Sequence, residues 1–469
     1  MRHSTAVPFR TQATIRRLLD EPGLPLARCL SAEQVHKACR AAGHVCRQRL
    51  FGPAVTLWMF LTQMLDPDHS CRKAVARFLA YRSALGLRPC SADNGGYCKA
   101  RSRLSEQVVR DLTRTTGQAL AESAPKIWLW KGRPVKIVDG TGLSMPDTAE
   151  NRKAYPPSRQ GTFPVMRLVV VFSLAVGTVL DAAMGCFRGK GGAELSLLRL
   201  LGDIFKPGDV WLGDRLYSTF WVVAKAMAAG ADIVMRLHGG RTPLVWYRGR
   251  GHSKGNKRVW WRKPKRPEWM SVKEYDAIPE WILLRALRVD VRRRGFRTRQ
   301  LVLVTTLTDD QSYAADDLAD LYRRRWQAEL DLRSLKQTLQ MDILRGKSPE
   351  MVRKEVWAHL LAYNLVRIVM VEAATKAQVR PDELSFTGAW QTIHAFSPYM
   401  RTVENDDQAC RLWQGMLAAI MRHRVGNRPD RIEPRAVKRR GKKFPTLKGS
   451  RAEARRRLRQ GVSRCGKKR

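Results

Sequence analysis

The stretch Val-Lys-Ile-Val-Asp-Gly-Thr at residues 135–141 places a short apolar run directly before an acidic residue, Asp139. The same arrangement recurs in Val-Trp-Leu-Gly-Asp-Arg at residues 210–215, where the acid is Asp214. Short apolar runs bounded by turn residues are typical of buried β-strands. Adjacent strand ends can bring two carboxylates side by side, where a cation relieves their repulsion. The two stretches therefore predict a sheet that holds a pair of acids.

The surrounding sequence predicts what kind of sheet this is. Residues 165–176 and 179–187 form two apolar runs that predict a hairpin of buried strands. Helical patterns follow over 194–205 and 219–229, and a further strand is predicted over 232–237. This order of strands and helices is typical of an α/β fold, a mixed sheet covered by helices.

A third acid, Glu329, lies in a helix predicted over residues 314–340. Its spacing from Tyr322, Arg325 and Lys336 places all four side chains within an arc of about 60°. A carboxylate flanked by two cations suits a phosphodiester site, because it can ligate a divalent cation while Arg and Lys pair with phosphate oxygens. Two metal ions need several oxygen ligands, so the two strand-end acids would supply the rest.

Each of these residues also has a structural interpretation. Glu329 could simply form helical i,i+4 pairs with Arg325 and Arg333. Asp139 before Gly-Thr is a frequent turn residue, and Asp214 before Arg is similar. The catalytic interpretation depends on the conjunction of all three acids with the four-residue helical pattern.

Composition points to a polyanionic partner. The chain has 469 residues, and its 44% of hydrophobic residues is ordinary for a folded protein. Its formal net charge of +44 is unusually high. Nucleic acid and an anionic membrane surface are the two candidate polyanions, and composition alone does not choose between them. No apolar run has the length and continuity of a membrane span, so no transmembrane segment is predicted.

Other signals limit the classes of function. The nine cysteines include no CxxC pair, which predicts reduced thiols in the cytoplasm. No GxxxxGK[ST] or GxGxxG motif occurs, which argues against a nucleotide cofactor. Residues 241–304 hold 18 Lys or Arg against 5 acids, with Trp260 and Trp261 among them, and predict a small all-β insertion. Residues 428–469 form a tail with 18 basic and 3 acidic residues, which favours a phosphate clamp.

Three motifs, in chain order, resemble those of the DDE transposases of the IS4 group of bacterial insertion sequences: Asp139-Gly-Thr, Gly-Asp214-Arg-Leu-Tyr and Tyr322-x2-Arg325-x3-Glu329-x6-Lys336. The resemblance implies an RNase H-like catalytic domain with a mixed sheet. In that domain Asp139, Asp214 and Glu329 would be the catalytic ligands of Mg²⁺, for which Mn²⁺ would substitute. It also implies that Tyr322, Arg325 and Lys336 contact transposon-end DNA.

The resemblance and the composition together predict a domain plan. It consists of a helical DNA-binding region (1–127), an RNase H-like domain in two parts (128–240 and 305–378), a β insertion between those parts (241–304), and a C-terminal helical region with the basic tail (379–469).

The implied activity is cut-and-paste transposition on double-stranded DNA by a dimer, with hairpin ends in some relatives. Some members stack a flipped base on a Trp in the strand before the signature helix, but no Trp lies near Gln300. Trp260, Trp261 or Trp281 would then take that role, and Arg215 is a further candidate DNA contact. The rival functions are a nuclease without strand transfer and a catalytically silent repressor that binds element ends. An RNA-binding protein is a third, for which no RRM or KH signature is present.

Overall fold

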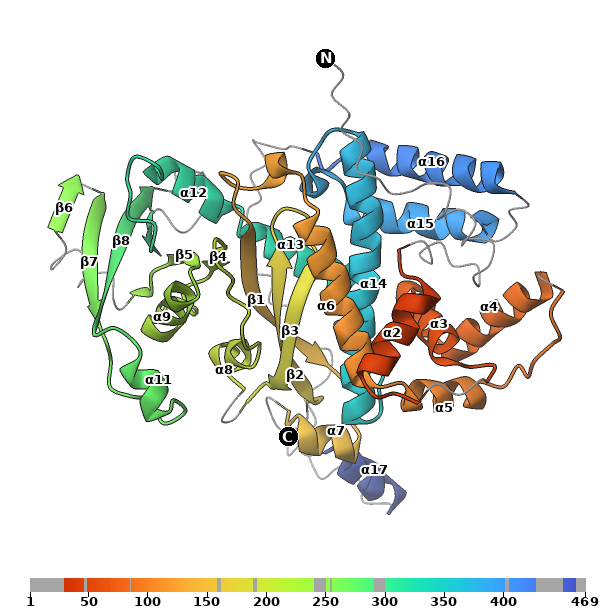
Figure 1. Cartoon of the computed structure of the whole chain (residues 1–469). Coiled ribbons are helices and arrows are strands. Elements are labelled where there is room, and N and C mark those ends of the chain that lie inside the picture. Colours follow the sequence, from red (N-terminus) through yellow and green to blue (C-terminus); the bar gives the residue numbers. More distant parts are fainter. Residues whose placement is uncertain are drawn as a thin grey trace, which may run out of the picture.

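The computed structural model describes residues 29–45, 49–84, 86–157, 162–188, 192–239, 250–253, 255–290, 300–400, 405–426 and 450–460. Within these residues a mixed nine-stranded sheet has the order β3-β2-β1-β4-β5-β9-β8-β7-β6 (Figure 1). The strands are β1 Val135–Ser144, β2 Val165–Ser173, β3 Val179–Cys186, β4 Val210–Gly213, β5 Asp232–Arg236, β6 Arg250–Ser253, β7 Asn256–Arg262, β8 Trp281–Asp290 and β9 Gln300–Thr305.

The pairing directions confirm the predicted mixed sheet and hairpin. β1, β2 and β3 form an antiparallel meander, whereas β4 runs parallel to β1 and β5 runs parallel to β4. β9 then pairs with β5 in the antiparallel direction. β2 is apolar along almost its whole length because both of its faces are covered, which is the pattern of a fully buried strand.

Helices cover both faces of this sheet. α8 Glu194–Arg199 and α9 Phe220–Ala228 pack over one apolar cluster, which includes Trp211 and Ile233. The opposite face belongs to a larger cluster, which includes Ile137 and Leu212 and continues into the helical regions. Helices that add residues to this cluster include α2 Ala32–Ala41, α3 Pro53–Leu65, α6 Glu106–Glu122, α7 Ala149–Ala154, α14 Pro349–Lys376, α15 Phe386–Met400, α16 Asp406–Arg422 and the helical turns of residues 315–333. α4 Cys71–Ala84 and α5 Gly95–Arg103 pack with α3 in a smaller separate cluster.

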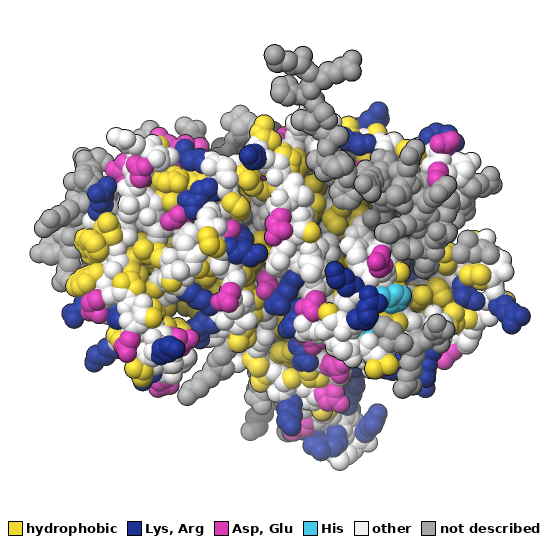
Figure 2. Space-filling model, viewed as in Figure 1, with side chains coloured by type: hydrophobic (Ala, Val, Ile, Leu, Met, Phe, Trp, Pro, Cys, Tyr) yellow, Lys and Arg dark blue, Asp and Glu magenta, His cyan; other side chains and the backbone are white. Residues whose placement is uncertain are grey.

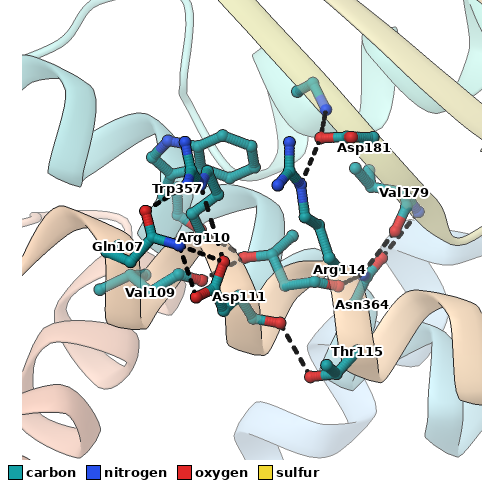
Figure 3. Close-up of polar contacts among 12 residues, drawn as sticks. Gln107, Val109, Arg110, Asp111, Arg114, Thr115, Val179, Asp181, Trp357 and Asn364 are labelled. Atoms are coloured by element: carbon teal, nitrogen blue, oxygen red, sulfur yellow. Dashed lines mark hydrogen bonds and ion pairs between the residues drawn. The ribbon is translucent and has the colours of Figure 1, made fainter. Parts of the chain in front are cut away.

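The N-terminal helices are joined to the sheet through α6, α14 and β3. Asn364 of α14 exchanges hydrogen bonds with the backbone of Val179, and its amide also donates to the Thr113 carbonyl of α6 (Figure 3). Arg114 of α6 donates to Asp181 of β3 at 2.7 Å. The helix can approach this closely because Gly117 has no side chain; a Cβ there would lie 1.9 Å from the Val179 carbonyl oxygen.

α14 is the one described helix that is long and apolar enough to cross a membrane by length and composition. Its apolar window is 89% buried within the protein, as expected of a central core helix. A fully buried ion pair joins α14 to the signature segment, because Arg367 donates to Asp331. Asp331 compensates the charge of Arg367 inside the core, and Arg367 also donates to the Tyr363 hydroxyl at 2.8 Å.

The signature helix is not continuous, contrary to the prediction of one helix over 314–340. It is divided into α12 Ala315–Arg323, α13 Trp326–Arg333 and a π-helical turn over Ser334–Thr338. At the break, the N–H groups of Arg324 and Arg325 donate to carbonyls three residues back, at 3.0 Å each. This tight turn coincides with a 3.7 Å ion pair between Arg324 and Asp382.

Two other predictions need correction. The helix predicted over 194–205 ends at Arg199, because the N–H groups of Leu200 and Leu201 switch to carbonyls three residues back. The segment predicted as all-β also contains a short helix, α11 Val272–Asp276, with a capping box at Ser271. Its strands β6 to β8 extend the central sheet through β9 (Figure 1).

Residues 427–449 and 461–469, which hold most of the predicted basic tail, lie outside the described residues. The helix α17 Arg451–Arg459 is the described part of the tail. On the face seen in Figure 2, Lys and Arg side chains are spread among Asp and Glu, and apolar side chains gather over the β7–β8 end of the sheet.

Candidate active site

The parallel pairing of β1 with β4 places Asp139 and Asp214 next to each other. The register pairs Val135 with Val210 and Ile137 with Leu212. Each acid comes two residues after the last of these pairs, and side chains two residues apart on a strand share a face. Asp214 itself lies just beyond the end of β4, and both carboxylates line one cavity, so they lie side by side as the sequence predicted.

β1 differs from its prediction in one respect. It does not end at Asp139 but continues to Ser144, because its second half pairs with β2 up to Val165. Asp139 thus projects from the middle of a strand, and one carboxylate oxygen accepts the Gly140 N–H at 2.8 Å. Asp214 stands in the turn after β4, where its carboxylate accepts the Leu216 N–H at 2.7 Å.

Arg325 links the third acid to the first. Its guanidinium donates to Glu329 at 2.5 Å and lies 3.5 Å from the Asp139 carboxylate. The helical i,i+4 pair of Arg325 with Glu329, which the sequence offered as a purely structural role for Glu329, is therefore present. It is not confined to the surface of the helix. Arg325 is only 15% exposed and bridges the signature segment to β1.

Burial and like charges shift the ionisation of Asp139. Its pKa is raised to about 6, chiefly because burial removes water from the carboxylate. The carboxylates of Glu329 and Asp214 raise that pKa further, whereas the Gly140 N–H and Arg325 act in the opposite direction. A carboxyl group that is crowded by two others and only partly compensated favours the approach of a further cation.

These groups line one cavity of about 630 Å³ between β1 and the signature segment. Lys336 also lines it and donates to the Thr141 hydroxyl at 3.1 Å, so the fourth residue of the signature lies over β1. The full lining consists of Asp139, Gly140, Thr141, Asp214, Arg325, Glu329, Leu332, Arg333, Lys336, Gln337 and Asp342.

Sequence reasoning missed some members of this lining. Asp342 is a fourth carboxylate at the cavity, and Arg333 and Gln337 are further polar groups. Arg333 lies one helical turn beyond Glu329, and Gln337 lies one turn beyond Arg333. Extending the helical face of Glu329 along the sequence could therefore have identified both. Asp342 follows the π-helical turn, and no periodic pattern in the sequence points to it.

Other predicted site residues lie outside the lining. Tyr322 is 8% exposed and packs in the core, and burial raises the pKa of its hydroxyl to about 12, so it stays protonated. Arg215 is exposed in the turn after Asp214. Trp260 and Trp261 lie on β7, five strands away from β1 in the sheet order, with Trp260 61% exposed.

The donor set fits a hard divalent cation such as Mg²⁺, because carboxylate oxygens are its preferred protein ligands. Among the described residues, no three acid, His or Cys side chains already stand as a closed metal-ligand group. Arg325 lies between Asp139 and Glu329 instead, so a cation that takes both carboxylates must displace the guanidinium from them.

Comparison with known proteins defines the class to which this fold and site belong. The family model described as "Transposase DDE domain" matches residues 130–365, about half of the chain, and includes all three acids. The chain therefore belongs to the DDE transposase-domain family.

Individual relatives place the chain more narrowly. It is 26% identical over 439 residues to the transposase InsG for insertion sequence element IS4 of Escherichia coli (strain K12), covering 91% of this chain and 95% of that protein. The predicted resemblance to the IS4 group is thereby confirmed. The putative transposase InsL for insertion sequence element IS186A of the same strain is 44% identical over 66 residues, 14% of this chain and 18% of that protein.

A solved structure of piggyBac transposase in a synaptic complex with hairpin DNA is also similar. The TM-score is 0.43 at 12% identity, over 89% of this chain and 88% of that chain.

The raised pKa of Asp139 predicts a measurable effect on stability. An unfolded Asp has a pKa near 3.9, so the folded state binds more protons between about pH 4 and pH 6. The folded state's preference for a protonated Asp139 stabilises the protein below about pH 4. This stabilisation is lost as the pH rises through about 6 and the buried carboxyl group ionises. Asp139→Asn should therefore be more stable than wild type at pH 8, by about 1–3 kcal/mol, with the difference vanishing towards pH 4.

Urea unfolding of the metal-free protein at several pH values measures this difference. Asp317→Asn is the control, because Asp317 forms an exposed ion pair with Lys131 and its loss should change stability by less than about 1 kcal/mol. An Asp139→Asn variant that is less stable than wild type at pH 8 would show that the Arg325 contact outweighs burial.

Proposed function

We propose that this chain is a cut-and-paste transposase that cuts DNA at the ends of an insertion sequence and joins the 3′ ends to target DNA. The observation that carries the proposal is the convergence of Asp139, Asp214 and Glu329 on one cavity that Arg325 and Lys336 also line. Family membership supports this reading, since the matched segment spans the same residues.

We infer that the catalytic domain is RNase H-like. The support is the strand order β3-β2-β1-β4-β5, in which an antiparallel meander is followed by two parallel strands. The first acid then projects from the first strand and the second acid follows the fourth strand. In this proposal, β6 to β8 are an insertion into the domain. We also propose the domain boundaries that the sequence predicted, with the catalytic domain in two parts at residues 128–240 and 305–378.

The chemistry divides between bound metal and protein side chains. Two Mg²⁺ ions, or Mn²⁺ in their place, would supply charge stabilisation to the attacking and leaving oxygens of a phosphodiester. Asp139, Asp214 and Glu329 would hold them. Lys336 would bind a phosphate oxygen as a point charge, and Arg325 would pair with one as a planar fork after it releases the carboxylates. Tyr322, buried beside Arg325, would orient that guanidinium rather than touch DNA.

Trp260, which lies on the same face of the sheet as Asp139, would contact DNA beyond the cavity. Paired residues in a sheet point to the same face, and one series of pairs connects the face of Asp139 with that of Trp260: Ile137–Leu212, Leu212–Val234, Val234–Thr305, Thr305–Arg285 and Arg285–Arg258. Trp261 has the opposite parity and packs against the other apolar cluster.

Five strand spacings of about 4.8 Å separate β1 from β7, which is about 24 Å or roughly seven base-pair steps. Trp260 is flanked on its face by Arg258 and Arg262, both exposed, and Trp281 lies directly across from Arg262. Exposed aromatic rings interleaved with Arg suit unpaired bases and their phosphates. Of the two predicted tryptophans, we therefore assign the DNA contact to Trp260.

The remaining partners follow from the activity. Double-stranded DNA is the substrate, a dimer would pair the two ends, and the reaction would take place on cytoplasmic DNA. The helical N-terminal region, Arg215 and the basic tail would add contacts to DNA through phosphate charge.

The test of this function uses DNA that carries the chromosomal flanks of the gene, together with the purified full chain and Mg²⁺. Wild type should make precise breaks at an inverted-repeat boundary and should join a pre-cut 3′ end to a target duplex. Glu329→Gln and Asp214→Asn should lose cleavage by at least about 10³-fold, because two-metal catalysis loses a ligand, while binding to the same DNA remains.

Arg333→Gln is the matched control, since it alters the cavity lining without removing a proposed metal ligand. Cleavage without joining would favour a nuclease, and equal binding without breaks by wild type and variants would favour an end-binding repressor. A wild-type rate of cleavage by Glu329→Gln would contradict the assignment of the acids.

Trp260→Ala should weaken binding to a duplex with a single-stranded overhang by about 1–3 kcal/mol, the usual contribution of one stacked base. Fluorescence anisotropy measures the affinity at fixed salt. Trp269→Ala is the control, because Trp269 is 46% exposed but lies under the Arg199 guanidinium, away from the face of Trp260. Equal losses in the two variants would remove Trp260 from the DNA path.

A further inference from the structure

Directly behind Asp139, on the opposite face of β1, a carboxylate fills the space where Gly140 lacks a side chain. A Cβ at Gly140 would lie 2.5 Å from the Cδ of Glu194 and 2.7 and 2.8 Å from its two oxygens. Successive side chains of a strand point to opposite faces, so this carboxylate lies beneath the strand that carries Asp139. Glu194 is the first residue of α8, and it does not line the catalytic cavity.

Glu194 has two polar partners, one from the turn after β4 and one from β2. The Tyr217 hydroxyl donates to one carboxylate oxygen at 3.0 Å, and an Arg167 guanidinium nitrogen lies 3.3 Å from the other. Arg167 belongs to β2, next to β1 in the sheet, and its guanidinium lies over the Phe187 ring. The Glu194 side chain is 19% exposed, so these contacts are largely shielded from water.

Tyr217 connects this carboxylate to the second acid. It is fully buried, and its backbone N–H donates to the Asp214 carbonyl at 3.2 Å, which closes the turn after β4. Its Cβ would lie only 3.0 Å from a Cβ at Gly213, so the side chain packs tightly against the end of the strand. Any movement of the Asp214 turn away from β1 therefore pulls on the Tyr217 hydroxyl.

The backbone alone does not hold the two acids together. The register of β1 with β4 ends at Ile137 and Leu212, two residues before Asp139 and Asp214. Beyond that pair, β1 continues with β2 as its partner while the chain after β4 turns away. The Tyr217–Glu194 hydrogen bond spans this gap from the far face of the sheet.

We propose that Glu194 is a positioning residue that, through Tyr217, fixes the spacing between Asp139 and Asp214. This inference rests on the proposed function, in which these two acids hold metal together. Glu194 touches neither substrate nor metal in this account. It sets the geometry of the pair of ligands, and loss of such supporting contacts typically costs 10–100-fold in metal affinity or activity.

The test is a calorimetric Mn²⁺ titration of the full chain, with thermal unfolding measured in parallel. Tyr217→Phe removes one hydroxyl and keeps the ring that packs on Gly213. It should raise the apparent Mn²⁺ dissociation constant by about 10–100-fold, as should Glu194→Ala. Glu194→Gln should restore most of the affinity, because its amide oxygen can still accept from Tyr217.

Tyr275→Phe is the matched control, since it removes a hydroxyl that donates to the Pro264 carbonyl at 3.1 Å in an exposed part of the insertion. It should bind Mn²⁺ as wild type does. A Tyr217→Phe variant that melts earlier but binds Mn²⁺ with wild-type affinity would overturn the proposal and leave Glu194 a purely structural group.

Asp139→Asn separates this failure from failure of the proposed function. If Asp139→Asn loses Mn²⁺ binding while Tyr217→Phe keeps it, only the positioning role is wrong. If neither wild type nor Asp139→Asn binds Mn²⁺, the metal assignment itself is wrong, and the positioning role falls with it.

Discussion

Everything at this site depends on holding three negative charges close together inside a partly desolvated cavity. The parallel register of β1 with β4 brings Asp139 and Asp214 to one face, and the signature segment adds Glu329. Like charges at short range repel strongly in a medium less polar than water. The structure offsets part of this repulsion with Arg325, which contacts Asp139 and Glu329 together. The pKa of Asp139 is nevertheless raised to about 6, chiefly by burial and further by the carboxylates of Glu329 and Asp214.

The rest of the fold can be understood as resistance to that repulsion. α13 is anchored from behind by the buried pair of Asp331 with Arg367 on α14, which prevents Glu329 from swinging away. α14 is itself fixed to β3 and α6 through the amide of Asn364. Removing one partner from a buried ion pair typically costs 3–5 kcal/mol, because the other charge is left buried and unpaired. A cluster of carboxylates that is supported from several sides and only partly compensated by Arg325 suits a bound cation.

Much of this arrangement could be predicted from local sequence. The short apolar runs before Asp139 and Asp214 indicated strands, and the apolar continuity of residues 165–187 indicated the hairpin, because burial on both faces leaves a clear pattern. The spacing of Arg325, Glu329 and Lys336 placed them on one side of a helix, and all three line the cavity. Arg325 stands at the break and Lys336 lies in the π-helical turn, yet both line the same cavity as Glu329.

What the sequence could not predict depends on contacts between distant segments. Tyr322 fits the helical face by spacing, yet the tight turn at Arg324 and Arg325 leaves it packed in the core. Glu194 resembles an ordinary first-turn acid of α8, and only the pairing of β1 with its neighbours shows that it lies against Gly140. Trp260 and Trp261 are adjacent on one strand and so point to opposite faces, but the register of five strand pairs is needed to show that Trp260 shares the face of Asp139.

In the proposed mechanism, Asp139, Asp214 and Glu329 share bound metal, and the metal displaces Arg325 from the carboxylates. Anomalous diffraction from crystals of the full chain soaked in Mn²⁺ can locate that metal. We expect a Mn²⁺ peak within about 2.5 Å of oxygens from at least two of the three carboxylates, with the guanidinium of Arg325 turned away. A Mn²⁺ peak elsewhere on the protein, or a cavity in which Arg325 still bridges Asp139 and Glu329 at saturating Mn²⁺, would contradict it.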